Sequence, residues 1–166
     1  MMNDMIVLSW KKGLFRCVYQ LFANGNKIGQ LKEKRWSQSA IGVSGGKNIL
    51  FRVKNSFVQS TDIIDIESGL TIGRIKYNCW WPKAKVEMEG KTYSWSFTNI
   101  WTTKWKIADE ENNEVKFSGH SVKGQVYSPI TDSKILLTGL FIANYYWQLH
   151  ITYLACVFAL FFIPWL

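Results

Sequence analysis

The sequence predicts a mostly β fold that ends in a hydrophobic α-helix, and three observations support this prediction. Aromatic residues make up 16% of the 166 residues, and aromatic side chains favour the pleated, half-buried surface of a sheet. Segments between residues 6 and 130 alternate apolar and polar side chains, as strands with one wet face do. Residues 135–166 contain no Asp, Glu, Lys or Arg. A chain of this length holds one core, so we treat residues 1–166 as a single domain.

The strand pattern is clearest in the middle of the chain. In residues 83–89, apolar side chains occupy every second position and charged side chains occupy the others. Gly90 begins a turn into residues 92–97, where three aromatic side chains share one face. Residues 104–107 repeat the scheme with lysines on the outer face. Three prolines in the whole chain interrupt this pattern little, so we expect an antiparallel meander of short strands.

An internal repeat organises the meander. Residues 25–32 align with residues 69–76 at an offset of 44 residues, and both copies carry an Ile-Gly pair, at Gly29 and at Gly73. The glycine shifts the apolar–polar alternation by one residue, which is typical of a β-bulge that bends a strand. A third, weaker copy starts near residues 109–115, where an Asn pair replaces the turn glycine. The sequence therefore predicts two to three meander repeats in a curved sheet.

The uncharged tail predicts one long helix over about residues 133–163. Asp132 and its neighbours provide N-cap chemistry, and Pro164 provides a stop. Asn144, Gln148 and Thr152 are spaced four residues apart, so the few polar groups form a narrow stripe on an otherwise apolar helix.

A helix that is apolar on nearly all sides is buried in protein or in lipid, so two interpretations stay open for the tail. In the first, the curved meander closes into a barrel around residues 136–148. In the second, the tail is a C-terminal membrane anchor, although Asn144, Gln148 and His150 would then lie unfavourably in hydrocarbon. Residues 151–166 fit either interpretation, inside a barrel, in a membrane or at an interface.

Two segments stand out: the bulged turn at residues 65–73 with its repeat partner 25–29, and the acidic helix start at residues 132–140. They resemble the tubby C-terminal-like superfamily, which includes tubby proteins, plant LURP-one-related proteins and phospholipid scramblases. The resemblance implies a closed antiparallel barrel of about twelve strands around a central hydrophobic helix. The phosphoinositide-binding residues of tubby proteins and the calcium-binding segments of scramblases have no counterpart here.

The sequence points away from catalysis and from metal or cofactor binding. Ser118 and His120 are two residues apart but lack a recognisable nucleophile motif, so we expect a non-enzymatic protein without cofactors. The three cysteines are widely spaced and odd in number, which favours buried free thiols in a reducing compartment. The first ten residues do not resemble a signal peptide. We therefore expect a cytoplasmic protein, associated with a membrane or anchored in one through its C-terminal segment.

Positive charge is the feature that suggests a function. The formal net charge is +8, which favours anionic partners. The candidate lipid-binding residues are basic strand residues and two tryptophans: Lys32, Lys34, Arg35, Arg74, Lys76, Trp80, Trp81, Lys83, Lys85, Lys104 and Lys106. Such lysines also occur as solvated residues that protect strand edges. We expect binding to an anionic membrane surface; the alternative is a tail-anchored protein whose cytosolic β-domain binds another protein. Nucleic acid is not the expected partner, because no RNA- or DNA-binding motif is present.

Overall fold

The computed structural model describes residues 5–13, 17–34, 37–54, 59–78, 80–120 and 122–162, with side chains as far as residue 160. It contains twelve strands and one helix in the order β1 (Ile6–Lys12), β2 (Val18–Ala23), β3 (Asn26–Glu33), β4 (Ala40–Ser44), β5 (Lys47–Val53), β6 (Ser60–Asp65), β7 (Thr71–Tyr77), β8 (Lys83–Met88), β9 (Lys91–Phe97), β10 (Lys104–Asp109), β11 (Glu114–His120), β12 (Lys123–Ser128) and α1 (Ser133–Phe162). The predicted fold class is confirmed.

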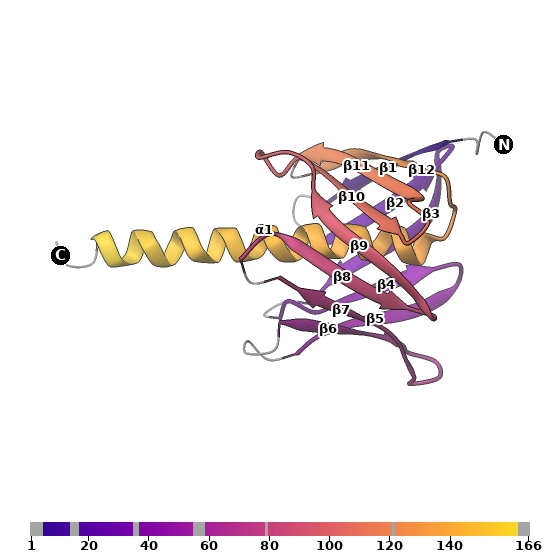
Figure 1. The fold of residues 1–166 in the computed structure, drawn as a ribbon, viewed down its shortest axis with the longest axis horizontal. Helices are drawn as coiled ribbons and strands as arrows, with labels where there is room; N and C mark the ends of the chain where they lie inside the picture. The colour runs from indigo at the N-terminus through magenta and orange to yellow at the C-terminus, as the bar shows by residue number, and fades with distance from the viewer. Residues whose placement is uncertain are drawn as a thin grey trace.

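The strands form one closed barrel. Each strand pairs antiparallel with its neighbours in the chain, and β1 closes the barrel by pairing with β12 from Ile6 opposite Ser128 to Lys11 opposite Lys123. Figure 1 shows this barrel around the first half of α1. Among the twelve described strands, closure leaves no edge unpaired, which removes the usual route to edge-to-edge aggregation.

The alternation in the sequence sets which side chains face the barrel interior. Trp95 of β9 lies opposite Ile107 of β10, and Ile107 lies opposite Val115 of β11; all three side chains are buried. The predicted inward row of Ala84, Val86 and Met88 on β8 is buried as well. Because successive strand residues point to opposite faces, the lysines between them point outward.

The predicted bulges occur in both copies of the repeat. In the β2–β3 hairpin the register shifts so that Leu21 faces Gly29 while Phe22 faces Lys27, and the β6–β7 hairpin shows the same shift opposite Gly73. In the third copy, between β10 and β11, the paired register is continuous. Its turn includes Asn112 at a φ of 61°, the left-handed conformation in which Asn replaces glycine.

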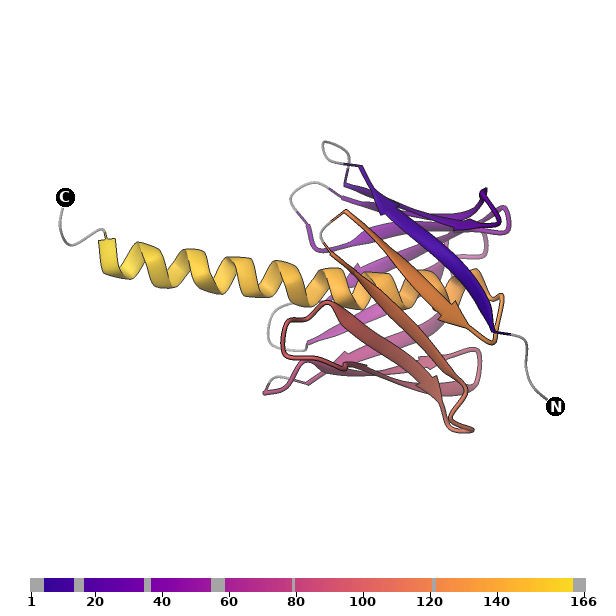
Figure 2. The same ribbon diagram turned by 90° about the horizontal axis from the view of Figure 1, so that it is seen from above.

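The first half of α1 fills the barrel along its axis (Figure 2). Asp132 caps the helix as predicted, because its carboxylate accepts a hydrogen bond of 2.9 Å from the backbone N–H of Lys134. Within the barrel, Phe141 stacks on Phe51 of β5 with ring centroids 4.5 Å apart. The indole N–H of Trp95 donates to the carbonyl of Gly139 over 3.1 Å. The aromatic core is thus built jointly by strands and helix.

The second half of α1 projects beyond the barrel, as Figures 1 and 2 both show. Side chains 135–146 are buried, 147–149 are half-buried, and 150–156 are exposed. The prediction that residues 136–148 are enclosed is therefore confirmed, with partial exposure at Trp147 and Gln148. The barrel is too short for the whole helix, since the twelve strands are each five to eight residues long.

Candidate functional site

The two ends of the barrel differ in charge. The exit rim, where α1 leaves the barrel, comprises the last two residues of the odd-numbered strands, the first two residues of the even-numbered strands and the described residues between them. The start rim is the opposite end of the barrel. It comprises the first two residues of the odd-numbered strands, the last two residues of the even-numbered strands, the described residues between them, and residues 129–132. This division follows from the antiparallel order, in which every odd-numbered strand runs toward the exit.

Basic residues gather at the exit rim and acidic residues at the start rim. Within the described residues, the exit rim has ten basic side chains and one carboxylate, that of Glu33. The start rim has three basic side chains and nine carboxylates. The exit-rim basic residues are Lys11, Lys12, Lys32, Lys34, Arg52, Lys54, Lys76, Lys83, Lys104 and Lys123. The protein is therefore strongly dipolar along the helix axis.

Large apolar side chains project from two connections of the exit rim. Trp80 and Trp81, between β7 and β8, are 89% and 68% exposed. Ile100 and Trp101, between β9 and β10, are 88% and 76% exposed. Tryptophan at such exposure is unusual for a surface that meets only water, because it leaves a large apolar area hydrated.

Local hydrogen bonds fix both of these connections. The side-chain oxygen of Asn78 accepts bonds from the backbone N–H groups of Trp80 and Trp81, at 2.8 and 3.1 Å. Asn99 does the same for Thr103 and Lys104, at 3.1 and 2.9 Å. The bonds to Asn78 form an Asx turn. Both loops are also tied to α1, because Tyr146 donates to the carbonyl of Lys83 and Trp147 donates to the carbonyl of Thr102. The loop tips present their apolar side chains to solvent.

The candidate residues from the sequence do not form one patch. Lys32 and Lys34 lie at the end of β3, Trp80, Trp81 and Lys83 between β7 and β8, and Lys104 at the start of β10. They therefore encircle the exit rim. Arg35 lies outside the described residues.

Four further candidates are paired with carboxylates; one of them, Lys76, belongs to the exit rim, and the other three lie between the two rims. Lys76 and Lys85 both contact Glu87, at 3.2 and 3.4 Å. Lys106 contacts Glu114, and Arg74 contacts Asp62 at 3.0 Å. These pairs neutralise part of the positive charge, which makes the unpaired rim lysines the stronger candidates for an anionic partner.

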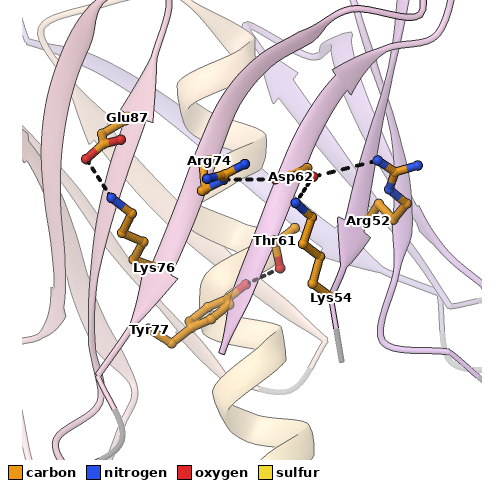
Figure 3. A network of polar contacts seen from close by, with 8 residues as sticks. All are labelled: Arg52, Lys54, Thr61, Asp62, Arg74, Lys76, Tyr77 and Glu87. Atoms are coloured by element: carbon orange, nitrogen blue, oxygen red, sulfur yellow. Dashed lines mark hydrogen bonds and ion pairs between the residues drawn. The ribbon is translucent and has the colours of Figure 1, made fainter. Parts of the chain in front are cut away.

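Asp62 lies at the centre of a basic cluster beside the exit rim (Figure 3). Its side chain is 3% exposed, and its carboxylate contacts Lys54 at 2.7 Å, Arg74 at 3.0 Å and Arg52 at 3.6 Å. Burial by itself raises the pKa of Asp62, but hydrogen bonds and charges from Lys54 and Arg74 outweigh it, so the pKa falls below its ordinary value. Three cations against one anion leave the cluster positive.

Polar groups line one side of the opening through which α1 leaves. The hydroxyl of Tyr19 donates to the side-chain oxygen of Asn144 over 2.9 Å, and the ammonium of Lys12 lies 3.1 Å from that hydroxyl and 3.3 Å from Glu33. Gln148 donates to Glu33 over 3.4 Å. Asn144 and Gln148 of the predicted stripe therefore meet polar partners on β2 and β3, and Lys12 of β1 contacts both of these partners. Burial, with the charge of Glu33, raises the pKa of Tyr19 far above its ordinary value.

The opposite side of the opening is closed by aromatic rings. Tyr145 stacks on Tyr77 with centroids 3.9 Å apart, and Tyr146 stacks on Trp95 at 5.4 Å. The hydroxyl of Tyr146 also donates to the carbonyl of Lys83 over 2.5 Å. The barrel is thus sealed against the helix on the β7–β9 side and polar on the β1–β3 side.

Beyond the opening, α1 exposes an uncharged surface. Ile151, Tyr153, Leu154, Phe158 and Leu160 are each more than half exposed. Within the described residues, no helix combines the length and the apolarity needed to cross a membrane.

The expectation that the cysteines are buried is wrong for two of them. Cys17 precedes β2 at the exit rim and Cys156 lies on the projecting part of α1; both are exposed free thiols. Cys79 lies outside the described residues. The sequence showed only that the cysteines lack a pairing motif. Whether each thiol is buried depends on where the barrel ends, which the sequence does not show.

Comparison with known proteins gave no match: no family model, no curated protein and no solved structure matched this chain. The resemblance to the tubby C-terminal-like superfamily stays a prediction.

Proposed function

We propose that the protein is a non-enzymatic barrel that binds anionic membrane lipid with its exit rim, at the cytoplasmic face of a membrane. One observation carries this proposal: the projecting apolar half of α1, the exposed tryptophans and the excess of basic residues all lie at the same end of the barrel. Amphipathic anchors use this combination, in which apolar groups enter the interface while lysines face the headgroups.

The charge distribution also favours one orientation. A lysine close to an anionic leaflet contributes about 1 kcal/mol, and this attraction decays within a Debye length of about 10 Å at 0.1 M salt. The exit rim is therefore attracted to the membrane, whereas the nine described carboxylates of the start rim are repelled if that end approaches. Docking through the exit rim places the outer part of α1 in the bilayer interface.

The alternative is a tail-anchored protein whose β-domain binds another protein. The uncharged outer half of α1 is the feature that favours it. The inner half of the helix belongs to the barrel core, since side chains 135–146 are buried, so only residues beyond the opening would serve as anchor. Such an anchor would hold without acidic lipid.

Vesicle flotation of the full chain separates these proposals. We expect binding to vesicles of phosphatidylcholine with 30% phosphatidylserine, and much weaker binding to pure phosphatidylcholine or at 1 M salt, where the Debye length is about 3 Å. Equal binding to both vesicle types at all salt concentrations would favour the anchor. No binding to either would contradict both proposals.

Matched lysine variants locate the surface. Lys83→Gln with Lys104→Gln removes two charges from the exit rim, whereas Lys47→Gln with Lys91→Gln removes two from the start rim. At about 1 kcal/mol per lysine, the first pair should weaken binding to acidic vesicles about thirtyfold. The second pair should change it little. Equal effects would show that the exit rim is not the binding surface.

A further inference from the structure

A pocket of about 480 Å³ opens at the exit rim beside α1. Tyr19, Asn144 and Gln148 line its polar side, and the side chain of Lys12 lines it as well. Trp101 and Ile151 add apolar surface. Among the described residues that line it, there is no carboxylate.

We propose that this pocket binds the phosphate of a single anionic glycerophospholipid molecule, whose acyl chains lie along the exposed face of α1. This proposal rests on the proposed function, because it assumes that the exit rim meets a membrane. It adds a specific subsite to a surface that would otherwise attract any anionic lipid.

The donors in the pocket suit a phosphate group. Two of the three N–H bonds of the Lys12 ammonium point to Tyr19 and Glu33, at 3.1 and 3.3 Å, which leaves one for a ligand among the described contacts. The side-chain oxygen of Asn144 is occupied by Tyr19, so its amide N–H groups are the part that can serve a ligand. His120 and His150 also line the pocket. Hydrogen bonds from a charged donor to phosphate are among the stronger polar contacts in proteins.

The surroundings of the pocket indicate a lipid as the source of the phosphate. Ile151 lines the pocket, and Leu154 and Phe158 follow it three and seven residues later, on the same face of the helix. All three are more than half exposed. A continuous apolar stripe therefore runs outward from the pocket, in the direction in which the proposed docking places the bilayer. A free phosphate compound would leave this stripe in water.

Lys12 carries the test, and Lys47 is its matched control. Lys12 lines the pocket at the exit rim, whereas Lys47 is an exposed lysine at the start rim, at the opposite end of the barrel. Titration calorimetry of the full chain with monomeric dihexanoyl phosphatidic acid should show saturable one-to-one binding. Lys12→Gln should weaken it about tenfold to a hundredfold, which is the loss of one charged hydrogen bond. Lys47→Gln should bind like the wild type.

A second pair of variants covers the case in which Lys12→Gln fails to fold because Glu33 has lost its ion-pair partner. His150→Glu adds a negative charge at an exposed position that lines the pocket, and Tyr153→Glu adds one on the same helix outside the lining. We expect His150→Glu to weaken binding of the short-chain lipid about tenfold or more and Tyr153→Glu to leave it unchanged. Monomeric lipid is used so that membrane insertion does not enter the comparison.

Phosphate ligands without acyl chains test whether the phosphate belongs to a lipid. Glycerol 3-phosphate and inorganic phosphate should bind at least about tenfold more weakly than the lipid, because they lose the apolar contact. Binding of glycerol 3-phosphate as tight as that of the lipid would overturn the lipid assignment. No saturable binding, or equal losses in each variant and its control, would overturn the pocket. If one of these results occurs but the protein still binds acidic vesicles, the pocket proposal fails and the proposed function stands. If the protein does not bind acidic vesicles either, the proposed function is contradicted as well.

Discussion

Tyr19 on β2 and Asn144 in α1 are joined by a hydrogen bond of 2.9 Å although they lie 125 residues apart in the chain. This bond fixes the helix inside the barrel at the level of the exit rim. It also explains why an otherwise apolar helix carries an amide there: Asn144 is buried, and a buried amide is stable only with a partner.

Removal of the Tyr19 hydroxyl should destabilise the protein. Tyr19→Phe leaves the buried oxygen of Asn144 without its donor, so we expect the free energy of unfolding to fall by about 1–3 kcal/mol. Tyr127→Phe is the control, because the Tyr127 hydroxyl bonds to Gln125 on the exposed outer face. Urea unfolding followed by circular dichroism measures both. Equal, small effects in the two variants would mean that the bond does not hold the helix.

A methyl group at Gly139 should also destabilise the protein, although alanine favours a helix more than glycine does. An added Cβ would lie 2.6 Å from the ring of Phe117, and that ring cannot shift freely because it stacks on Trp105 at 5.4 Å. We expect Gly139→Ala to reduce the free energy of unfolding by about 1–3 kcal/mol. Alanine alone would otherwise add about 1 kcal/mol in a helix.

The smaller side chain of Phe117→Leu makes room for that methyl group. The double variant should therefore be more stable than the sum of the two single changes predicts. A stabilised Gly139→Ala variant would show that α1 is not closely packed at this point.

Asp62 should contribute stability that depends on pH. Its folded pKa lies below the ordinary 3.8, so the stabilisation is present above about pH 3.8 and is lost as the pH falls through the lower, folded value. Asp62→Asn should reduce the free energy of unfolding at pH 7 by about 1.5–3 kcal/mol, the range for hydrogen bonds to charged groups. The difference from wild type should shrink below pH 3.8.

Urea unfolding of wild type and Asp62→Asn at pH 7, 5, 4 and 3 gives this profile. Glu67→Gln removes a carboxylate that is exposed at the start rim and should change the free energy of unfolding little. A difference between Asp62→Asn and wild type that stays constant from pH 7 to pH 3 would contradict the role of the charge.

The exposed tryptophans should contribute to membrane binding and not to folding. Trp80→Ser with Trp81→Ser should weaken binding to acidic vesicles at least about tenfold, since each ring would transfer apolar area into the interface. Ile66→Ser with Leu70→Ser is the control at the start rim, where the side chains are also exposed. Unchanged vesicle binding in the tryptophan variant would exclude this connection from the binding surface.

The fold was predictable because its signals are local. Alternation gave the inward rows such as Ala84, Val86 and Met88, and the shift at Gly29 and Gly73 gave the two bulges. The same residues could not show where α1 leaves the barrel. Leu140 and Leu154 are chemically identical, yet one is buried and the other exposed, because the height of the barrel decides between them.

The candidate surface was predictable only in part. Lys83 and Lys104 could be named from the strand pattern, but the separation of ten basic residues from nine carboxylates appears only when the strands are arranged in a barrel. Lys11 and Lys12 are adjacent on β1 but have different surroundings, because successive side chains of a strand point to opposite sides: Lys11 is exposed, whereas Lys12 lines the pocket. Ile100 and Trp101 were missed, although two apolar residues in a turn between strands were a signal available in the sequence.

The position of the exit rim relative to a bilayer is the central claim, and spin-label depth measurement tests it most directly. Leu154→Cys and Ser68→Cys would each carry a nitroxide in a chain whose native cysteines are replaced by serine; Leu154 lies on the projecting helix and Ser68 at the start rim. On vesicles with 30% phosphatidylserine, we expect the label at 154 to become accessible to oxygen and shielded from a water-soluble nickel chelate, with no change at 68. Shielding at 68, or no change at 154 while the protein is bound, would contradict the proposed orientation.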